Sequence, residues 1–355
     1  MSVRVAVVGL GWAGRELWLS LLREHPDFEV VAVVDADPAA RAAFADEPGT
    51  AVHASVAELT AAAVDLAVVA VPNHLHASVA AALLSEQIPV FMEKPVCLST
   101  AEADLLDAAE RGGAVLLAGS AARHRGDIAA LGGLIPELGG VRHVCLGWVR
   151  SRGVPRSGWF TQRDKAGGGV LFDLGWHLFD ALASLLGPVP FAQVVGSTTD
   201  DFVNLGSWGA TWRQDRAAGD TADVEDTARG FLVREDGVSV SLLTSWASHE
   251  PLDLSLVRVE GSTGVAELRC TFGFSPNRSE PVLTLTREGA STRVELPAEP
   301  IGAEYRRQLD GLAALLADPG NRGRAIAEAR TNVATIESFY ASARASVRPA
   351  SPAYQ

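Results

Sequence analysis

The sequence predicts an α/β protein with two domains: a doubly wound parallel sheet in residues 1–121, and a mainly antiparallel sheet with helices in residues 122–355. Three observations lead to this prediction. The chain begins with an apolar strand, a glycine turn and a helical pattern. Strand and helix patterns then alternate as far as residue 120. Beyond residue 122, short strands joined by turns follow one another, as in an antiparallel sheet.

The N-terminal turn has the pattern of a dinucleotide-binding unit. An apolar run, residues 3–8, leads into G-x-G-x-x-G at Gly9, Gly11 and Gly14. A second apolar strand ends on Asp35, 21 residues after the last of these glycines. In this pattern the first glycine allows the tight turn, the second lets the backbone approach a pyrophosphate, and the third lets the helix pack on the strand.

The start of the helix and Asp35 predict the cofactor. Free N–H groups and the positive end of the helix dipole lie near Trp12 and Ala13, where they can face phosphates. Asp35 can accept hydrogen bonds from the adenosine ribose and would repel a 2′-phosphate, so the sequence predicts NAD rather than NADP. The alternative is a glycine turn that only joins two elements. The pair Asp37-Pro38 is typical of a helix cap followed by proline at the first helical position.

Further elements alternate up to residue 118, and two strands end in polar motifs. The sequence predicts helices at 39–45, 55–59, 77–85 and 101–111, and strands at 51–53, 64–71, 89–92 and 114–118. Ligands of such sheets bind at the carboxyl ends of the strands. The stretches 72–76 and 93–95 follow two strands, so we expect them to converge with the glycine turn.

The second region is predicted to hold one long helix among its strands. This helix spans 169–186 and ends at Gly187-Pro188. A bridging helix at 126–135 precedes the region, and residues 303–346 are helical again. Strands are expected at 141–149, 191–197, 227–233, 238–247, 252–259, 265–271, 282–286 and 292–296.

Composition and charge limit the function classes. A length of 355 residues with 48% hydrophobic content allows two cores. The net charge of −13 argues against a nucleic-acid or anionic-membrane partner. The chain has no signal-peptide pattern at its start, and no apolar run approaches the roughly 20 residues of a membrane span. Cys97, Cys145 and Cys270 lack metal-binding spacing, so we expect buried thiols in a cytoplasmic protein and no metal site.

Lysine is rare in this chain. Only Lys94 and Lys165 occur among 30 basic residues, so arginine serves wherever a general positive charge suffices. Because arginine does not deprotonate, a lysine that survives this bias is a candidate for a chemical role. Chance survival is the alternative.

Three polar residues mark the long helix. Asp173 and His177 are four residues apart, Asp180 follows three residues later, and an α-helical period places all three on one face. A carboxylate beside an imidazole suits proton transfer, because the acid can orient the ring and histidine titrates near neutral pH. Pairs at this spacing are also common on solvated faces, and the helix taken alone favours that simpler explanation.

Taken together, the motifs resemble one family. The sequence is similar to the glucose–fructose oxidoreductase / inositol dehydrogenase (Gfo/Idh/MocA) family of NAD(P)-dependent oxidoreductases. The resemblance rests on residues 9–14, 72–76, 93–95, 167–180 and 260–264, which occur in the family's order over most of the chain. It implies a Rossmann domain followed by an α/β domain whose open sheet forms subunit interfaces, and therefore a homodimer or homotetramer.

The resemblance also implies roles for single residues. Lys94 matches the catalytic lysine, His177 the proton acceptor, and Asp173 its neighbour in the substrate site. Arg123 holds a substrate-site position, and His76 fits either a cofactor contact or a structural place at a helix start. With the glycine turn included, the expected cofactor-binding residues are Gly9, Gly11, Trp12, Ala13, Gly14, Asp35, Val71, Pro72, Asn73, His76, Glu93 and Lys94.

The substrate is expected to be a sugar, a nucleotide sugar or a cyclitol. Trp159, Arg163 and Lys165 directly precede the glycine triplet and should overhang the site. A tryptophan face suits a sugar ring, and the two bases suit a phosphate or carboxylate. A packing tryptophan with two solvated bases fits equally well. The sequence also resembles hexose 3-dehydrogenases that prepare ketosugars for transamination in aminoglycoside antibiotic assembly.

The expected reaction is oxidation of a secondary hydroxyl to a ketone with NAD. His177 takes the hydroxyl proton as the hydride leaves, and Lys94 hydrogen-bonds the oxygen. Two alternatives remain open. One is an eliminase or glycosidase that recycles its NAD, and the other is a redox-silent dinucleotide-binding regulator.

Overall fold

The computed structural model describes residues 2–156, 158–212 and 221–345, and the chain divides into two compact units. The first contains Met1–His124, Asp164–Gly167 and Gly302–Val333, and the second contains Arg125–Arg163, Gly168–Ile301 and Ala334–Gln355. The first unit therefore includes much of the C-terminal helical segment, which the sequence prediction placed in the second domain. The functional boundary near residue 121 stays a prediction.

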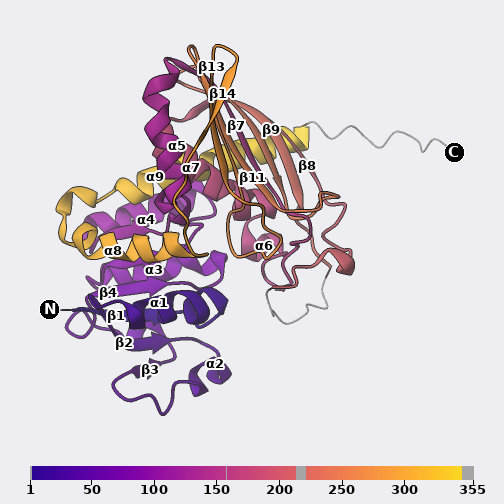
Figure 1. The fold of residues 1–355 in the computed structure, drawn as a ribbon. Helices are drawn as coiled ribbons and strands as arrows, with labels where there is room; N and C mark the ends of the chain where they lie inside the picture. The colour runs from indigo at the N-terminus through magenta and orange to yellow at the C-terminus, as the bar shows by residue number, and fades with distance from the viewer. Residues whose placement is uncertain (1, 157, 213–220, 346–355) are drawn as a thin grey trace. The chain divides into compact units, whose positions relative to one another are not determined.

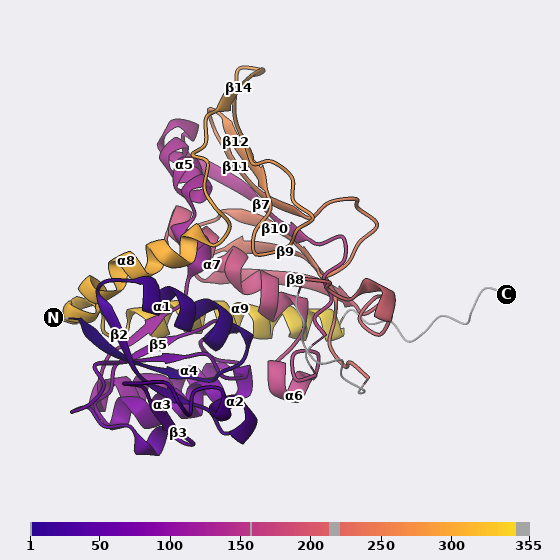
Figure 2. The ribbon, with the colours of Figure 1, turned by 60° about the horizontal axis from the view of Figure 1, so that its bottom comes forward.

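The first unit is built on a six-stranded parallel sheet with the order β3-β2-β1-β4-β5-β6, of which β2, β3 and β5 are labelled in Figure 2. Its strands are β1 (Val3–Val8), β2 (Phe28–Val34), β3 (Ala51–His53), β4 (Leu66–Val69), β5 (Val90–Met92) and β6 (Leu116–Ala118). The strands β4 and β5 are buried throughout, because a continuous apolar run suits a strand covered on both faces. The predicted doubly wound sheet is confirmed.

The helices of the first unit refine the prediction in two places. The predicted helix 55–59 is a single 3₁₀ turn, η2 (Val56–Glu58), closed by a capping box between Ser55 and Glu58. The helix after the glycine turn begins as a π-helix, η1 (Ala13–Leu19), and continues as α1 (Ser20–Glu24). The other helices are α2 (Pro38–Ala42), η3 (Asn73–Leu75), α3 (His76–Ser85), α4 (Thr100–Gly112), η4 (Ala121–His124), α8 (Ala303–Ala317), η8 (Pro319–Asn321) and the first part of α9 (Arg324–Ala345).

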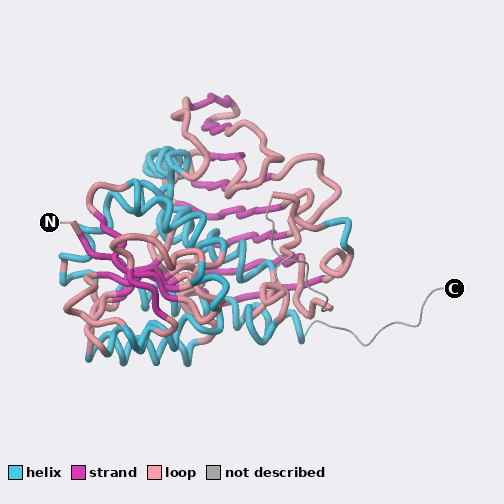
Figure 3. The backbone as a smooth tube through the Cα atoms, turned by 90° about the horizontal axis from the view of Figure 1, so that it is seen from below, coloured by secondary structure: helices cyan, strands magenta, loops and turns pink. Residues whose placement is uncertain are grey.

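The second unit is built on an eight-stranded sheet with the order β14-β13-β12-β11-β7-β10-β9-β8, seen as a ladder of strands in Figure 3. Its strands are β7 (Val141–Val149), β8 (Phe191–Thr199), β9 (Thr227–Arg234), β10 (Ser239–Ser245), β11 (Leu254–Gly261), β12 (Val265–Cys270), β13 (Val282–Arg287) and β14 (Ala290–Val294). Neighbouring strands are antiparallel except for β7 and β10, which are parallel. The predicted, mainly antiparallel sheet is confirmed.

Helices cover one face of this sheet. The helix α5 (Gly126–Leu134) packs on β12 and β13, and α7 (Trp176–Leu186) packs on β7 (Figure 1). Phe339, in the second part of α9, lies against Gly196 and Gly230, where a β-carbon would clash with its ring. The predicted helix 169–186 has a π-helical beginning, η6 (Leu171–Gly175), before α7. The remaining short helices of the second unit are η5 (Ile135–Leu138) and η7 (Gly206–Trp208), while α6 (Arg163–Ala166) falls mostly in the first unit.

The opposite face of the sheet is open. Val195 and Phe231 directly precede and follow the glycines that face Phe339, so their side chains point to the other face. Their exposed fractions are 62% and 48%. Large apolar side chains on an uncovered sheet face are typical of an interaction surface.

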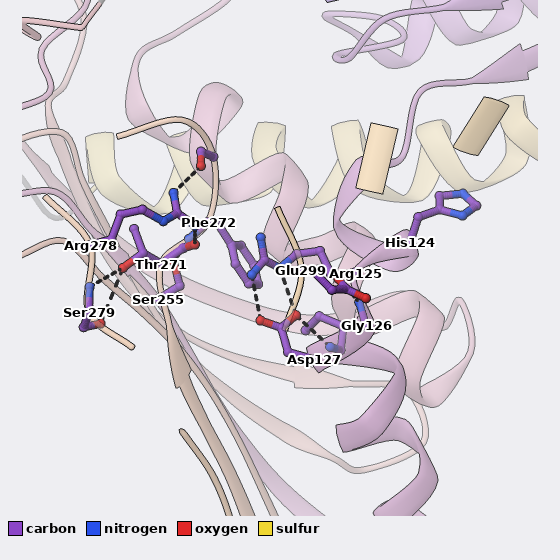
Figure 4. Close-up of polar contacts among 12 residues, drawn as sticks. His124, Arg125, Gly126, Asp127, Ser255, Thr271, Phe272, Arg278, Ser279 and Glu299 are labelled. Carbon is purple, nitrogen blue, oxygen red and sulfur yellow. Dashed lines mark hydrogen bonds and ion pairs between the residues drawn. The ribbon is translucent and has the colours of Figure 1, made fainter. Parts of the chain in front are cut away.

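A polar cluster fixes the entry to α5 (Figure 4). Arg125 donates two hydrogen bonds to Asp127, at 2.9 and 2.6 Å, and its guanidinium lies 4.4 Å from the ring centroid of Phe272. The peptide N–H of Gly126 donates to Glu299 at 3.2 Å. These contacts tie the first turn of α5 to the loop after β12 and to the segment that precedes α8.

The stretch Arg163–Leu186 corrects one expectation. It is long and apolar enough to cross a membrane by length and composition, although no such run was expected. However, most of this apolar stretch is buried inside the protein. The core helix of a soluble protein has the same composition, so this stretch is only weak evidence for a membrane span.

Candidate active site

The glycine turn has the geometry that its sequence predicts. Gly9 has φ +93°, and a β-carbon there would lie 2.7 Å from the carbonyl oxygen of Ala70. A β-carbon at Gly14 would clash with the carbonyl oxygen of Gly9. At Gly11, by contrast, nothing lies within 4 Å of the added carbon. Open space at the middle glycine is the fit that a pyrophosphate requires, and Trp12 and Ala13 are half-buried at the adjoining helix start.

Asp35 has a structural function in addition to the predicted one. Its carboxylate accepts hydrogen bonds from the peptide N–H of Leu10 at 2.7 Å and of Asp37 at 2.8 Å. The same side chain therefore holds the glycine turn and the start of α2. Each carboxylate oxygen has a second lone pair, so ribose hydroxyls can still be bound.

The turn that carries Lys94 is held by buried neighbours. Glu93 accepts a hydrogen bond from the Trp18 indole at 2.8 Å and another from the peptide N–H of Lys94 at 2.9 Å. Burial raises the pKa of the Glu93 carboxyl, and the nearby Lys94 ammonium opposes that shift. The buried Asn73 donates from its side chain to the carbonyl oxygen of Ala166 at 3.0 Å.

His76 ties this turn to the end of β4. The side chain is 1% exposed, and its Nδ1 and Nε2 atoms lie 2.6 Å from the carbonyl oxygen of Pro95 and 2.8 Å from that of Val71. Burial lowers the pKa of the ring, while the two carbonyl groups raise it. Both ring nitrogens face main-chain oxygens, which favours the structural role at the helix start over a cofactor contact.

In the second unit, Asp173 and His177 are enclosed. Asp173 accepts a hydrogen bond from the Trp246 indole at 2.9 Å, and the Arg150 guanidinium lies 3.8 Å away. His177 is 9% exposed, and its ring centroid is 5.6 Å from that of Trp148. The simpler explanation of a solvated polar stripe is therefore wrong, because the sheet and its end loops cover this face of the helix.

A buried carboxylate holds the start of the same helix, and sequence reasoning missed it. Glu225 is 4% exposed, and its Oε1 accepts hydrogen bonds from the peptide N–H groups of Gly169 at 3.0 Å and Leu171 at 3.1 Å. The Tyr340 hydroxyl donates to the same oxygen at 2.7 Å. Burial raises the pKa of Glu225, and these donors oppose it. The only signal in the sequence is an acidic residue just before a buried strand.

Close approach to this carboxylate explains two residues of the glycine triplet. A β-carbon at Gly169 would clash with the main chain of Glu225, and one at Gly168 would clash with the Tyr340 hydroxyl. Because these two positions have no side chain, Gly168 and Gly169 leave room for the Tyr340 hydroxyl and for Glu225, whose carboxylate caps the helix.

The predicted substrate residues have different surroundings. Arg123 forms an ion pair with Glu328 at 2.7 Å. Arg163 donates its peptide N–H to Asp223 at 2.7 Å, and its guanidinium lies 3.6 Å from Glu225. Trp159 and Lys165, which are close to Arg163 in sequence, are half-buried. The Trp159 indole packs on Phe160, with ring centroids 4.8 Å apart. The substrate roles of Arg123, Trp159, Arg163 and Lys165 stay predictions, as do the catalytic roles of Lys94, Asp173 and His177.

In the described part of the chain, no group of three or more His, Cys, Asp or Glu could hold a metal ion.

Comparisons with known proteins agree with this architecture. Residues 3–120 match a family model described as the GFO/IDH/MocA oxidoreductase family with an NAD-binding Rossmann fold, and residues 136–267 match the GFO/IDH/MocA C-terminal domain. A putative UDP-kanosamine synthase oxidoreductase subunit of Amycolatopsis mediterranei (strain S699) is 69% identical over 100% of both chains. A D-glucoside 3-dehydrogenase of Escherichia coli (strain K12) is 30% identical over 69% of this chain and 70% of its own. Among solved structures, GenD2 from gentamicin A biosynthesis in complex with NAD has a TM-score of 0.76 at 26% identity, over 97% of this chain and 94% of its own.

Proposed function

The chain belongs to the GFO/IDH/MocA family of NAD-dependent oxidoreductases, and from this premise we propose that it oxidises the 3-hydroxyl of UDP-glucose to a ketone. The observation that carries the proposal is the full-length identity of 69% with an enzyme subunit named for UDP-kanosamine synthesis. Kanosamine is glucose with an amino group at carbon 3. A 3-ketone is the intermediate on which transamination would place that group. The D-glucoside 3-dehydrogenase name of a second relative points to the same carbon.

The mechanism that we propose assigns a role to each of three side chains. His177 accepts the proton of the reacting hydroxyl, and Asp173 orients the imidazole or the substrate beside it. Lys94 hydrogen-bonds the same oxygen and stabilises the charge that develops there. The glycine turn and Asp35 would hold NAD, which would supply the hydride acceptor. Asp35 and the open space at Gly11 support NAD as the cofactor.

The test is turnover with matched substrates. Purified protein and NAD are mixed with UDP-glucose, glucose or methyl glucoside, and NADH is followed by its absorbance. We expect sustained NADH formation with UDP-glucose and a product whose keto group is at carbon 3 by NMR. No NADH and no ketone with any of the three would contradict the proposal. A changed sugar without net NADH would replace it with the cofactor-recycling alternative.

The assembly and location belong to the same proposal. The open face of the eight-stranded sheet, with Val195 and Phe231, supports a homodimer or homotetramer formed through this sheet. The three cysteines are free thiols, which supports a cytoplasmic location. Light scattering of the wild type and of Phe231→Asp tests the assembly, and equal mass in both would contradict this interface.

A further inference from the structure

An aromatic cluster lies in the loops that follow the strands β8 and β10 of the eight-stranded sheet, and it is not part of the helix that carries His177. The ring of Trp208 lies 4.7 Å from that of Phe202 and 5.3 Å from that of His249, at interplanar angles of 61° and 84°. Trp208 and Phe202 are half-buried, and His249 is exposed. An aromatic cluster that remains open to solvent provides a surface on which a flat ligand ring can stack.

Two arginines converge on this cluster. The guanidinium carbon of Arg152 lies 5.6 Å from the ring centroid of Trp208. The guanidinium of Arg156 fills the space beside Gly209, where a β-carbon would clash with it. Both arginines are exposed. We call Arg152, Arg156, Phe202, Trp208 and His249 the arginine–tryptophan platform.

The charge of these arginines has no acidic counterpart in the described residues. Arg152 and Arg156 make no ion pair there, whereas Arg150, nearby in sequence, lies 3.8 Å from Asp173. Asp201 and Glu250 flank the aromatic cluster in sequence, but neither pairs with an arginine of the platform in the described chain. In a protein with a net charge of −13, two arginines that lie against Trp208 and Gly209 without carboxylate partners among the described residues favour an anionic ligand.

Main-chain pairing connects the platform to the Asp173 side chain. Arg152 forms an antiparallel bridge with Ala247, and the preceding residue, Trp246, donates its indole N–H to Asp173. Steps of about 3.8 Å along the chain and about 5 Å across paired strands place the Cα atoms of Arg152 and Trp246 within roughly 10 Å. The Trp208 main chain is fixed to the same segment, because its carbonyl accepts a hydrogen bond from Val154 at 3.1 Å.

We propose that the arginine–tryptophan platform binds the nucleoside diphosphate part of a sugar-nucleotide substrate. The two guanidinium groups hold the diphosphate, and Trp208 stacks on the pyrimidine ring. The sugar extends from the diphosphate toward Asp173 and His177. This assignment rests on the proposed function, since it takes the sugar end of the substrate to lie at those two residues.

Binding of UDP tests the platform independently of turnover. Calorimetry with UDP is performed on the wild type, Arg152→Ala, Arg156→Ala and Trp208→Leu, with Arg293→Ala as the control, an exposed arginine on β14 at the far edge of the sheet. Loss of a charge-assisted phosphate contact should weaken UDP binding roughly 10- to 100-fold in each arginine variant. Inorganic pyrophosphate should lose affinity in the arginine variants and keep it in Trp208→Leu, because it has no ring to stack.

Kinetics separate this inference from the proposed function. If the enzyme oxidises UDP-glucose, the ratio of its kcat/KM to that for methyl glucoside should fall at least tenfold in Arg152→Ala, and Arg152→Lys should restore part of it. Wild-type affinity for UDP in both arginine variants would overturn the platform, even with full UDP-glucose oxidation. Arginine-dependent UDP binding without UDP-glucose oxidation would support the platform and contradict the proposed reaction.

Discussion

The turn that carries Lys94 and the helix that carries His177 are held in place by different kinds of contact. The Lys94 turn is fixed in part from nearby, because His76 lies against carbonyl groups only 5 and 19 residues away, although the Trp18 indole that bonds to Glu93 is 75 residues from it. The helix is fixed from afar, since Trp246 is 73 residues from Asp173 and Glu225 is 56 residues from Gly169. We call the contacts of His76 the local clamp, and the contacts of Trp246 and Glu225 the remote clamp. Contacts between residues close in sequence leave a compact motif, whereas contacts between distant residues leave only scattered single residues.

The largest effect should come from the two residues for which we propose catalytic roles, His177 and Lys94. His177→Ala and Lys94→Ala should each lower kcat by about 10²- to 10⁴-fold, because the proposed proton acceptor or hydrogen-bond donor is lost. Steady-state rates measure this, and NAD binding by calorimetry should stay close to the wild-type value in His177→Ala. Groups that act on one oxygen are not additive, so the double variant should lose little more than either single one. Fully multiplied losses would place the two residues in separate steps.

Loss of the remote clamp should lower the folding stability more than loss of the local clamp. Glu225→Ala leaves two peptide N–H groups and the Tyr340 hydroxyl without their acceptor, so we expect a loss of about 2–4 kcal/mol in the free energy of unfolding. Urea denaturation measures it, and Glu235→Ala, which removes an exposed carboxylate in the same unit, is the control. Equal midpoints for the two variants would show that the helix does not depend on this cap.

The charge of Glu225 can be separated from its hydrogen bonds with Glu225→Gln. Burial raises the pKa of this carboxyl in the folded state, so the folded chain binds the proton more tightly than the unfolded chain does. This contribution to wild-type stability is therefore fully present below the unfolded pKa and is lost as the pH rises through the folded pKa. Melting curves over this pH window should show a steeper decline for the wild type than for the glutamine variant. Parallel curves would contradict the shift.

The local clamp should respond more weakly. His76→Leu removes the ring between the carbonyl groups of Val71 and Pro95, and with it the N–H that a neutral imidazole donates to one of them, which should cost about 1–3 kcal/mol and lower kcat by misplacing Lys94. Thermal unfolding and steady-state rates provide the two readouts, with His74→Leu, an exposed histidine two residues earlier, as the control. A rise in the Kd of NAD with unchanged kcat would instead favour the cofactor contact for His76.

The smallest effect is expected at the hydrogen bond that orients Asp173. Trp246→Phe keeps an aromatic ring but removes the indole N–H that donates to the carboxylate at 2.9 Å, so kcat/KM should fall about tenfold. Trp176→Phe removes an equally buried indole from α7 and controls for the change in volume. The same loss in both variants would attribute the effect to packing rather than to the orientation of Asp173.

The fold could be predicted almost completely because each strand has its own apolar run and each helix its own period. All eight strands of the second sheet were expected, and the parallel pairing of β7 with β10 was not, since pairing partners leave no local signal. The glycine turn, Lys94 and the Asp173–His177 pair were also proposed from local motifs, and the site roles of these residues stay predictions. The sequence favoured a solvated face for Asp173 and His177, whereas the structure buries both residues under remote elements. The contacts of Glu225 and Tyr340 also depend on remote elements. Sequence reasoning therefore missed this burial and these contacts.

The double use of Asp35 limits redesign of the coenzyme preference. A residue that only sensed the 2′ position could be exchanged for a neutral or basic one at little risk. Here the carboxylate also accepts the N–H groups of Leu10 and Asp37. A substitution meant to admit a 2′-phosphate would therefore loosen the loop that positions the pyrophosphate. Engineers should keep an acceptor at this position, with asparagine or serine as the first choices, and introduce the new positive charge elsewhere.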